Sequence, residues 1–296
     1  MMDVQLDQLR AFVAAIDSGT FEAAARVLRV TPSAISQRIK ALEGATGRVL
    51  MQRVKPVSVT TSGETVLRFA RQVLLLEDDA ERELGADEAE IASIPIVINS
   101  DSLATWALPA LARVASAHRV VFDVFREDQD HSTARLRDGS VMAAITSVAE
   151  PVQGCIVRAL GHMRYRPMAS PGFAQRWFPD GAVAPAAALK AAPVIIYDRS
   201  DDLQDRYLRR HAGRSAAPPR HFIPASNEYA SAVRLGLGWG MLPEDQIGSL
   251  EASGELVAIG DDAIDVPLYW QQWRLHSALL AAVADEIAAT ASDALR

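Results

Sequence analysis

Residues 21–43, FEAAARVLRVTPSAISQRIKALE, contain two short helix-forming segments joined by a tight turn. Thr31-Pro32 opens the second segment with an N-cap residue followed by proline at the first helical position. Ile35, Ile39 and Leu42 share one face of that segment, and polar side chains occupy the opposite face. Two short helices arranged in this way, the second presenting polar donors, are typical of a helix-turn-helix that reads double-stranded DNA.

The polar face of the second helix carries side chain types that contact DNA. Ser, Gln and Arg can pair with base edges, and Lys or Ser can contact phosphates; the alternative is that they only solvate a surface helix. The next stretch, RVLMQRVKPVSVTT at 48–61, favours DNA binding, because it predicts a two-stranded wing with basic residues at its tip. The candidate DNA-binding residues are Thr31, Ser33, Ser36, Gln37, Arg38, Lys40, Arg53 and Lys55.

A long helix is predicted from residue 62 or 63 through Leu84. Its apolar side is too extensive to remain exposed to water, so we expect the helix to pair with the same helix of a second subunit in a homodimer. Two homodimers could assemble further into a homotetramer. A dimer also supplies two reading heads for two half-sites. The apolar side of this helix consists of Leu67, Ala70, Val73, Leu74 and Leu76.

Charge is unevenly distributed along the 296 residues, whose net charge is −7. Residues 1–71 hold ten Lys or Arg and six Asp or Glu, whereas Glu77 to Glu90 supply eight acidic residues. The basic end is therefore the candidate for phosphate contact. A composition of 49% hydrophobic residues indicates a globular protein. Neither a secretory signal nor an apolar stretch of membrane-spanning length is visible, which predicts a cytoplasmic protein without a membrane partner.

The N-terminal motifs together resemble those of a known family. The run at 21–43, then Leu50-Met51-x-Arg53, then Thr60-x-x-Gly63, is similar to the DNA-binding signature of LysR-type transcriptional regulators. Met51 departs from that signature, which usually has Phe, but the change is apolar and should only repack the wing. The resemblance implies a linker helix and an effector domain like a periplasmic binding protein, with RNA polymerase as a possible partner.

The remaining chain predicts that second domain independently. Short apolar runs alternate with helical segments and end in caps rich in Asp and Ser, as in Ile94 to Ile98 and Val194 to Tyr197. Such alternation predicts doubly wound α/β lobes that bind ligands at the carboxyl ends of their strands. The fold class is thus an all-α winged helix-turn-helix domain with a long linker helix, followed by a two-lobed α/β effector domain. The predicted boundaries are 1–62 for the DNA-binding domain, 63–90 for the linker helix and connection, and 91–296 for the effector domain, with lobe one at 91–163 plus 268–296 and lobe two at 164–267.

Acidic side chains dominate the predicted strand ends. Carboxylates suit an ammonium or guanidinium group, and free backbone N–H groups suit a carboxylate, so a ligand with both is a basic amino acid. The alternative is that Asp and Ser at these positions only cap helices, as they do in any α/β protein. The candidate effector-binding residues are Ser100, Asp101, Ser102, Glu127, Asp128, Thr146, Asp198 and Glu228.

A closer resemblance covers nearly the whole chain. NSDSLATWALPAL at 99–111, EDQDHSTARLRDG at 127–139, YDRSDDLQ at 197–204 and LGWGMLPE at 237–244 look like the ArgP/LysG branch of the LysR-type regulators. The resemblance implies that lysine or arginine is the effector, that no cofactor is needed, and that the regulated gene encodes an exporter of basic amino acids. Whether the effector activates or represses stays open.

Three other functions compete with this interpretation. A solute-binding protein would share the two-lobed fold, but that function does not account for the basic N-terminal domain. An enzyme is disfavoured, because the sequence lacks a G-x-S-x-G elbow, a P-loop and an H-E-x-x-H motif. Residues 235–240, LGLGWG, have spaced glycines but precede a strand, so they are interpreted as a helix end and turn. A DNA-binding protein that ignores ligands, or one with a different effector, remains possible.

Overall fold

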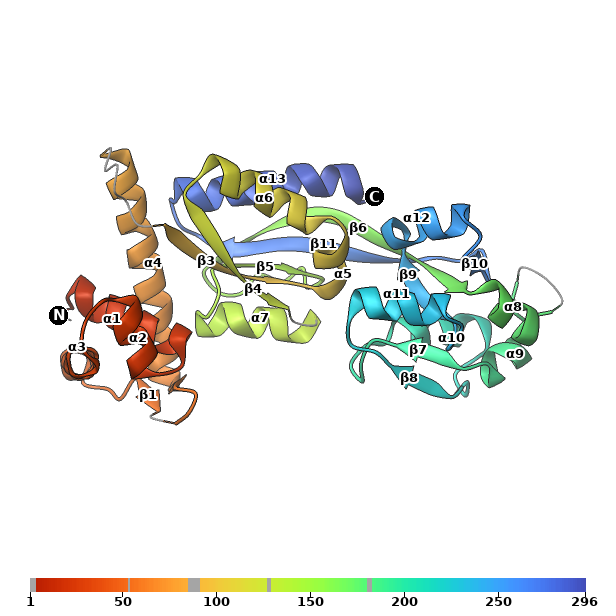
Figure 1. Cartoon of the computed structure of the whole chain (residues 1–296), viewed down its shortest axis with the longest axis horizontal. Helices are drawn as coiled ribbons and strands as arrows, with labels where there is room; N and C mark the ends of the chain where they lie inside the picture. Colours follow the sequence, from red (N-terminus) through yellow and green to blue (C-terminus); the bar gives the residue numbers. More distant parts are fainter. Residues whose placement is uncertain (1–3, 53, 85–90, 127–128, 180–182) are drawn as a thin grey trace.

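The computed structural model describes residues 4–52, 54–84, 91–126, 129–179 and 183–296. Figure 1 shows an elongated molecule with a small helical head and one long helix at one end, followed by two α/β lobes side by side. No helix in the described ranges is long and apolar enough to cross a membrane.

The head is a three-helix unit with a small wing. Thr20 Oγ1 accepts a hydrogen bond from Ala23 N at 3.1 Å, and Thr31 Oγ1 accepts one from Ala34 N at 3.1 Å, so each threonine caps the helix that follows it. The wing strands β1 and β2 pair antiparallel over two residues each. The elements of the head are α1 (Leu6–Ser18), α2 (Phe21–Val27), α3 (Pro32–Thr46), β1 (Met51–Gln52) and β2 (Ser58–Val59).

Helix α4 (Thr61–Glu83) is shared between the head and the rest of the chain. Leu67 and Ala70 are buried in the apolar core of the head, whereas Leu75 belongs to the core of the α/β lobes. Arg71 forms an ion pair with Asp17 of α1, which fastens the helix to the head. Phe69 and Leu76, by contrast, are 42% and 40% exposed in the single chain.

Lobe one contains three parallel strands of a mixed sheet, covered by helices on both faces. Strand β3 lies between β4 and β5 and is parallel to both. Helices α6 and α13 pack together over one face, and α7 covers the other (Figure 1). The elements of lobe one are β3 (Ala92–Ile98), α5 (Ser100–Thr105), α6 (Ala107–Ala117), β4 (Val120–Arg126), α7 (Gln129–Asp138), β5 (Ala143–Thr146) and α13 (Ala278–Ala294).

Two long antiparallel strands, β6 (Cys155–Ala169) and β11 (Ile264–Trp273), connect the lobes. Strand β11 pairs with β5 of lobe one, and the far part of β6 pairs with β9 and β10 of lobe two. The register of the pair shifts between Leu268 and Tyr269, opposite Gly161, whose φ of +133° few other residues adopt. Strand β6 is long because its far part continues as part of the second lobe's sheet.

Cys155, the single cysteine, begins strand β6. It is 6% exposed, and burial raises the pKa of its thiol to about 11. The thiol is therefore protonated and poorly reactive near neutral pH.

Lobe two holds the second strand–helix alternation. Strands β7 and β8 are parallel, and β7 also forms a parallel bridge with Trp239 beside β9. Residues 235–239 form a turn between α11 and β9, as the sequence predicted, and Gly236 there has a φ of +78°. The elements are α8 (Pro171–Trp177), α9 (Ala186–Ala191), β7 (Val194–Ile196), α10 (Leu203–His211), β8 (Arg220–Phe222), α11 (Ser226–Arg234), β9 (Gly240–Pro243), α12 (Glu244–Ala252) and β10 (Val257–Ala258).

Candidate nucleic-acid interface and ligand cleft

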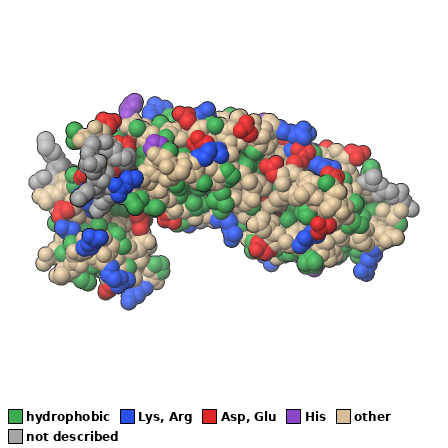
Figure 2. All heavy atoms as spheres, turned by 45° about the horizontal axis from the view of Figure 1, so that its top comes forward, with side chains coloured by type: hydrophobic (Ala, Val, Ile, Leu, Met, Phe, Trp, Pro, Cys, Tyr) green, Lys and Arg blue, Asp and Glu red, His purple; other side chains and the backbone are tan. Residues whose placement is uncertain are grey.

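The outer face of α3 presents the side chains predicted to contact DNA. Ser33, Gln37 and Lys40 are exposed and Ser36 is half-buried, while Ile35, on the opposite face, is fully buried in the head. Figure 2 shows Lys and Arg side chains gathered on the head, at the lower left of that view. The helix therefore offers hydrogen-bonding groups and positive charge on one exposed surface.

Other predicted DNA-binding residues have additional structural partners. Thr31 uses its hydroxyl oxygen as the N-cap of α3. Arg38 Nε lies 3.0 Å from Asp7 Oδ2, in a pair whose side chains are 31% and 45% exposed. An exposed pair of this kind contributes only ~0–1 kcal/mol, so Asp7 holds the Arg38 side chain only weakly. Lys55 is exposed in the wing, and Arg53 lies outside the described residues.

A cleft between the two lobes is lined mainly by polar side chains. Lobe one contributes the residues that follow β3, and lobe two contributes the loop after β7, helix α10 and residues near β9. The acidic residues outnumber Arg206, the single Lys or Arg among the described lining residues. The lining residues are Asn99, Ser100, Asp101, Tyr165, Tyr197, Asp198, Ser200, Asp201, Asp202, Leu203, Gln204, Arg206, Tyr229, Met241, Pro243, Gln246 and Val266.

Asp101 joins the two lobes across this cleft. The Tyr165 hydroxyl donates to Asp101 Oδ2 at 2.6 Å, and the Ser226 hydroxyl donates to Oδ1 at 2.6 Å. Asp101 lies on α5 of lobe one, whereas Ser226 begins α11 of lobe two. Burial, and then the negative charge of Asp101, raise the pKa of Tyr165 well above its ordinary value, which keeps that hydroxyl a donor. The carboxylate of lobe one is thus held by two hydroxyl groups of lobe two.

The acids of lobe two are held by the loop that carries them. Asp198 Oδ1 accepts hydrogen bonds from Ser200 N at 2.7 Å and from Asp201 N at 3.0 Å. Asp201 in turn accepts hydrogen bonds from Tyr197 N at 3.2 Å and Leu203 N at 2.9 Å. Burial raises the pKa of Asp201, and the nearby charges of Asp101 and Asp198 raise it further. These carboxylates therefore order the loop. They also concentrate negative charge at a place where a bound cation would reduce the repulsion between them.

The structure brings together three of the predicted effector-binding residues, Ser100, Asp101 and Asp198, in the cleft lining. Ser102 and Thr146 are buried outside that lining, and Thr146 Oγ1 accepts a hydrogen bond from Val148 N at 3.2 Å. Glu228 is exposed on α11 and outside the lining, whereas the next residue of that helix, Tyr229, is buried and lines the cleft. Glu127 and Asp128 lie outside the described residues.

Sequence reasoning did not select several lining residues as candidates. Asp201 and Asp202 belong to the acidic strand end that the sequence indicated, so position alone could have added them. Tyr165 lies within a long strand and Gln204 within a helix, where no strand-end signal exists. Among the described residues, no group of three or more His, Cys, Asp or Glu is placed to hold a metal ion.

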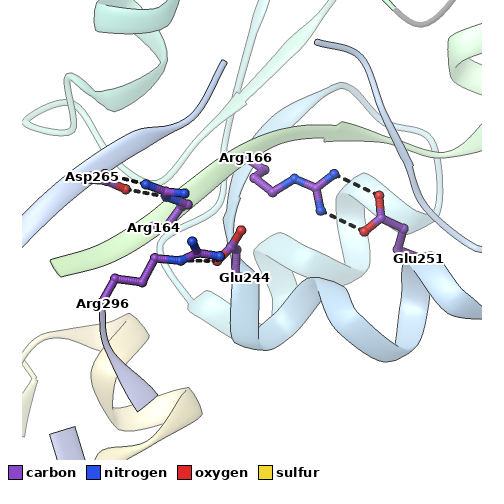
Figure 3. Close-up of polar contacts among 6 residues, drawn as sticks. All are labelled: Arg164, Arg166, Glu244, Glu251, Asp265 and Arg296. Carbon is purple, nitrogen blue, oxygen red and sulfur yellow. Dashed lines mark hydrogen bonds and ion pairs between the residues drawn. The ribbon is translucent and has the colours of Figure 1, made fainter. Parts of the chain in front are cut away.

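Three ion pairs lie near the junction of the lobes (Figure 3). Arg164 pairs with Asp265 across β6 and β11, and Arg166 pairs with Glu251 of α12. Arg296, which follows α13 of lobe one, lies 2.8 Å from Glu244 at the start of α12 in lobe two. These pairs tie lobe two to the connecting strands and to lobe one.

Comparisons with known proteins agree with this two-part geometry. Residues 6–64 match the model of the lysR family of bacterial regulatory helix-turn-helix proteins, and residues 92–292 match the LysR substrate binding domain. The chain belongs to the LysR family. It is a LysR-type DNA-binding transcription regulator and not an enzyme. The DNA-binding head of the LysR family also argues against a solute-binding protein.

Relatives and solved structures extend over the whole chain. The lysine export transcriptional regulatory protein LysG of Corynebacterium glutamicum is 39% identical over 100% of both chains. The crystal structure of ArgP from Mycobacterium tuberculosis is 45% identical, covers 98% of each chain and has a TM-score of 0.83. Full-length LysG from C. glutamicum with bound effector Arg is 37% identical, covers 99% of this chain and 100% of its own, and has a TM-score of 0.76. This chain is thus similar along its full length to the ArgP and LysG members of the LysR family.

Proposed function

We propose that this LysR-type regulator binds a basic amino acid, lysine or arginine, in the cleft between its lobes and controls a gene for an amino acid exporter. The observation that carries the proposal is the cleft lining, whose described residues include four aspartates, Asp101, Asp198, Asp201 and Asp202, and one basic residue, Arg206. Carboxylates make charge-assisted hydrogen bonds to ammonium and guanidinium groups, and Arg206 suits the ligand's carboxylate. The names of the similar proteins, a lysine export regulator and a LysG with bound Arg, support the same ligand class.

The ligand would act by changing the relation between the lobes. Asp101 of lobe one accepts hydrogen bonds from Tyr165 and Ser226 of lobe two, so a cation that competes for its oxygens changes the lobe-to-lobe hydrogen bonds. Because α4 packs against both the head and lobe one, a change in the lobes can reach the reading heads. No cofactor takes part in this scheme.

The assembly in this proposal is a homodimer, or a homotetramer built from dimers. Phe69 and Leu76 leave exposed apolar area on α4, which a second copy of the helix would cover. Paired heads would bind promoter DNA in the cytoplasm, where contact with RNA polymerase would allow control of transcription.

The proposal is tested by measuring ligand binding and DNA binding on the same full-length protein. We expect lysine or arginine, but not glutamate or Nε-acetyl-lysine, to raise the melting temperature, because a ligand that binds only the folded state stabilises it. The same ligands should change the footprint on the exporter promoter. If lysine and arginine change neither the melting temperature nor the footprint, the effector part of the proposal is wrong. If the protein does not bind duplex DNA at modest salt, the proposed role in gene regulation is wrong as well.

A further inference from the structure

Two glutamine side chains line the cleft beside the acids. Gln204 of α10 is 1% exposed, and Gln246 of α12 is half-buried. Each donates a hydrogen bond through Nε2 to a hydroxyl group, and each has a buried Oε1 without a hydrogen-bond partner in the described part of the chain. Buried acceptors are rarely left unmatched in native proteins, so these two oxygens indicate sites for donors that a ligand supplies.

The orientation of Gln204 is fixed by the hydroxyl that it contacts. The Tyr229 hydroxyl donates its hydrogen to the Ile195 carbonyl oxygen at 2.9 Å, and Met241 N donates to the same hydroxyl at 3.1 Å. A hydroxyl has one hydrogen to give, so Tyr229 must accept from the glutamine amide 2.7 Å away. Gln204 therefore turns its Nε2 to Tyr229 and keeps its carbonyl oxygen for another partner.

The orientation of Gln246 follows from the same rule. The Ser226 hydroxyl gives its hydrogen to Asp101 Oδ1 at 2.6 Å, and Asp101 Oδ2 already accepts from Tyr165. Ser226 must then accept from Gln246 Nε2, 2.8 Å away. This second chain of hydrogen bonds also leaves a carbonyl oxygen, Gln246 Oε1, as an unmatched acceptor.

We infer that Gln204 and Gln246 are specificity-determining residues that favour a guanidinium, so that the site binds arginine more tightly than lysine. The inference rests on the proposed function, that the cleft binds a basic amino acid. A guanidinium offers five N–H donors in a planar fork, whereas an ammonium offers three. The ammonium of lysine donates its hydrogen bonds to the carboxylates. The amide oxygens of Gln204 and Gln246 then stay without a donor. A site binds a ligand more weakly when that ligand leaves buried polar groups of the site without hydrogen bonds.

The test is calorimetric titration of the full-length protein with L-arginine and with L-lysine. We expect wild-type protein to bind arginine about tenfold more tightly, which corresponds to one unmatched buried hydrogen-bonding group. Gln204→Met and Gln246→Met remove each oxygen at similar side-chain volume. Each should weaken arginine binding about tenfold and lysine binding about twofold or less. Gln175→Met, at an exposed position on α8, is the matched control and should change neither affinity.

The outcomes separate this inference from the proposed function. Equal binding of the two amino acids by wild-type protein, tighter binding of lysine, or an equal loss of both affinities in the variants overturns the inference alone. Absence of binding by either amino acid overturns the proposed function together with it. If Gln204→Met lowers the melting temperature so far that it does not fold, Gln246→Met decides the question. That side chain is half-buried, and the Ser226–Asp101 hydrogen bond does not depend on it.

Discussion

The guanidinium carbon of Arg68 lies 5.0 Å from the centroid of the Trp273 ring. Arg68 belongs to α4, whereas Trp273 ends β11, the strand whose Val266 lines the ligand cleft. Arg68 Nη1 also donates to the backbone carbonyl oxygen of Arg137 at 2.9 Å, at the end of α7. One side chain thus connects the linker helix to two elements of lobe one, and one of these elements runs directly to the cleft.

Arg68→Ala is expected to weaken the link between ligand binding and DNA binding. A cation–π contact contributes about 0.5–2 kcal/mol, so its loss loosens α4 without unfolding the lobes. Calorimetry should give a ligand affinity within about twofold of wild type, while the ligand-dependent change in the promoter footprint shrinks. Arg137→Ala is the control, because the hydrogen bond from Arg68 goes to the main-chain oxygen of Arg137, which this substitution keeps. An unchanged ligand response in Arg68→Ala would show that Arg68 carries no coupling.

Gly139→Ala is expected to destabilise the same junction. Gly139 has a φ of +78°, and a Cβ there would lie 2.7 Å from the backbone nitrogen of Arg68. Strain and steric clash together should lower the free energy of unfolding by about 2 kcal/mol or more, measured by denaturant titration. Gly213→Ala has a similar φ of +87° with nothing within 4 Å, so it should lose only the ~1 kcal/mol of backbone strain. Equal losses in the two variants would argue against close packing of α4 on lobe one.

Ligand affinity should depend on pH through Asp201. Its pKa is raised by burial, so the carboxyl gains a proton at a higher pH than an ordinary aspartate does. A cationic ligand binds the ionised form better, so its affinity is full above the raised pKa and falls as the pH decreases through it. Titrations of arginine between pH 7 and pH 4 measure this change. Asp201→Asn should bind more weakly at pH 7 and show a flatter profile; an unaltered profile would assign the effect to another group.

Substitutions on α3 should separate base reading from phosphate contact. Gln37→Ala is expected to cost about 1–3 kcal/mol of specific binding and to relax base preference at one position. Lys40→Ala should weaken binding to all sequences similarly and reduce the salt dependence by about one phosphate contact. Fluorescence anisotropy against specific and scrambled duplexes at several salt concentrations measures both effects. Identical behaviour of the two variants would contradict this division of roles.

The local features of the fold could be predicted because they depend on neighbours in the sequence. Thr20 and Thr31 cap their helices, and the apolar run at Ile94 to Ile98 lies in a buried strand, because a few adjacent residues determine each feature. The full length of β6 could not be predicted, because its far end is stabilised by pairing with β9, more than seventy residues later in the chain.

The site was predictable only where it coincides with strand ends. Asp101 and Asp198 follow β3 and β7, and both line the cleft. Glu228 carries the same local signal but is exposed, because the orientation of α11 against lobe one decides which residue faces the cleft. The role proposed for Gln204 depends on the direction of the Tyr229 hydroxyl bond, a property of tertiary structure that no local pattern contains.

The burial of Cys155 makes the molecule convenient for site-directed spectroscopy. Its thiol is both sterically protected and protonated near neutral pH, so maleimide reagents should not react with it in the folded protein. Cysteines introduced at Val27 on the head and Leu235 in lobe two, where the native side chains are 66% and 73% exposed, would then take spin labels or dyes without background. Distances between such labels would report directly how far the heads move when an amino acid enters the protein.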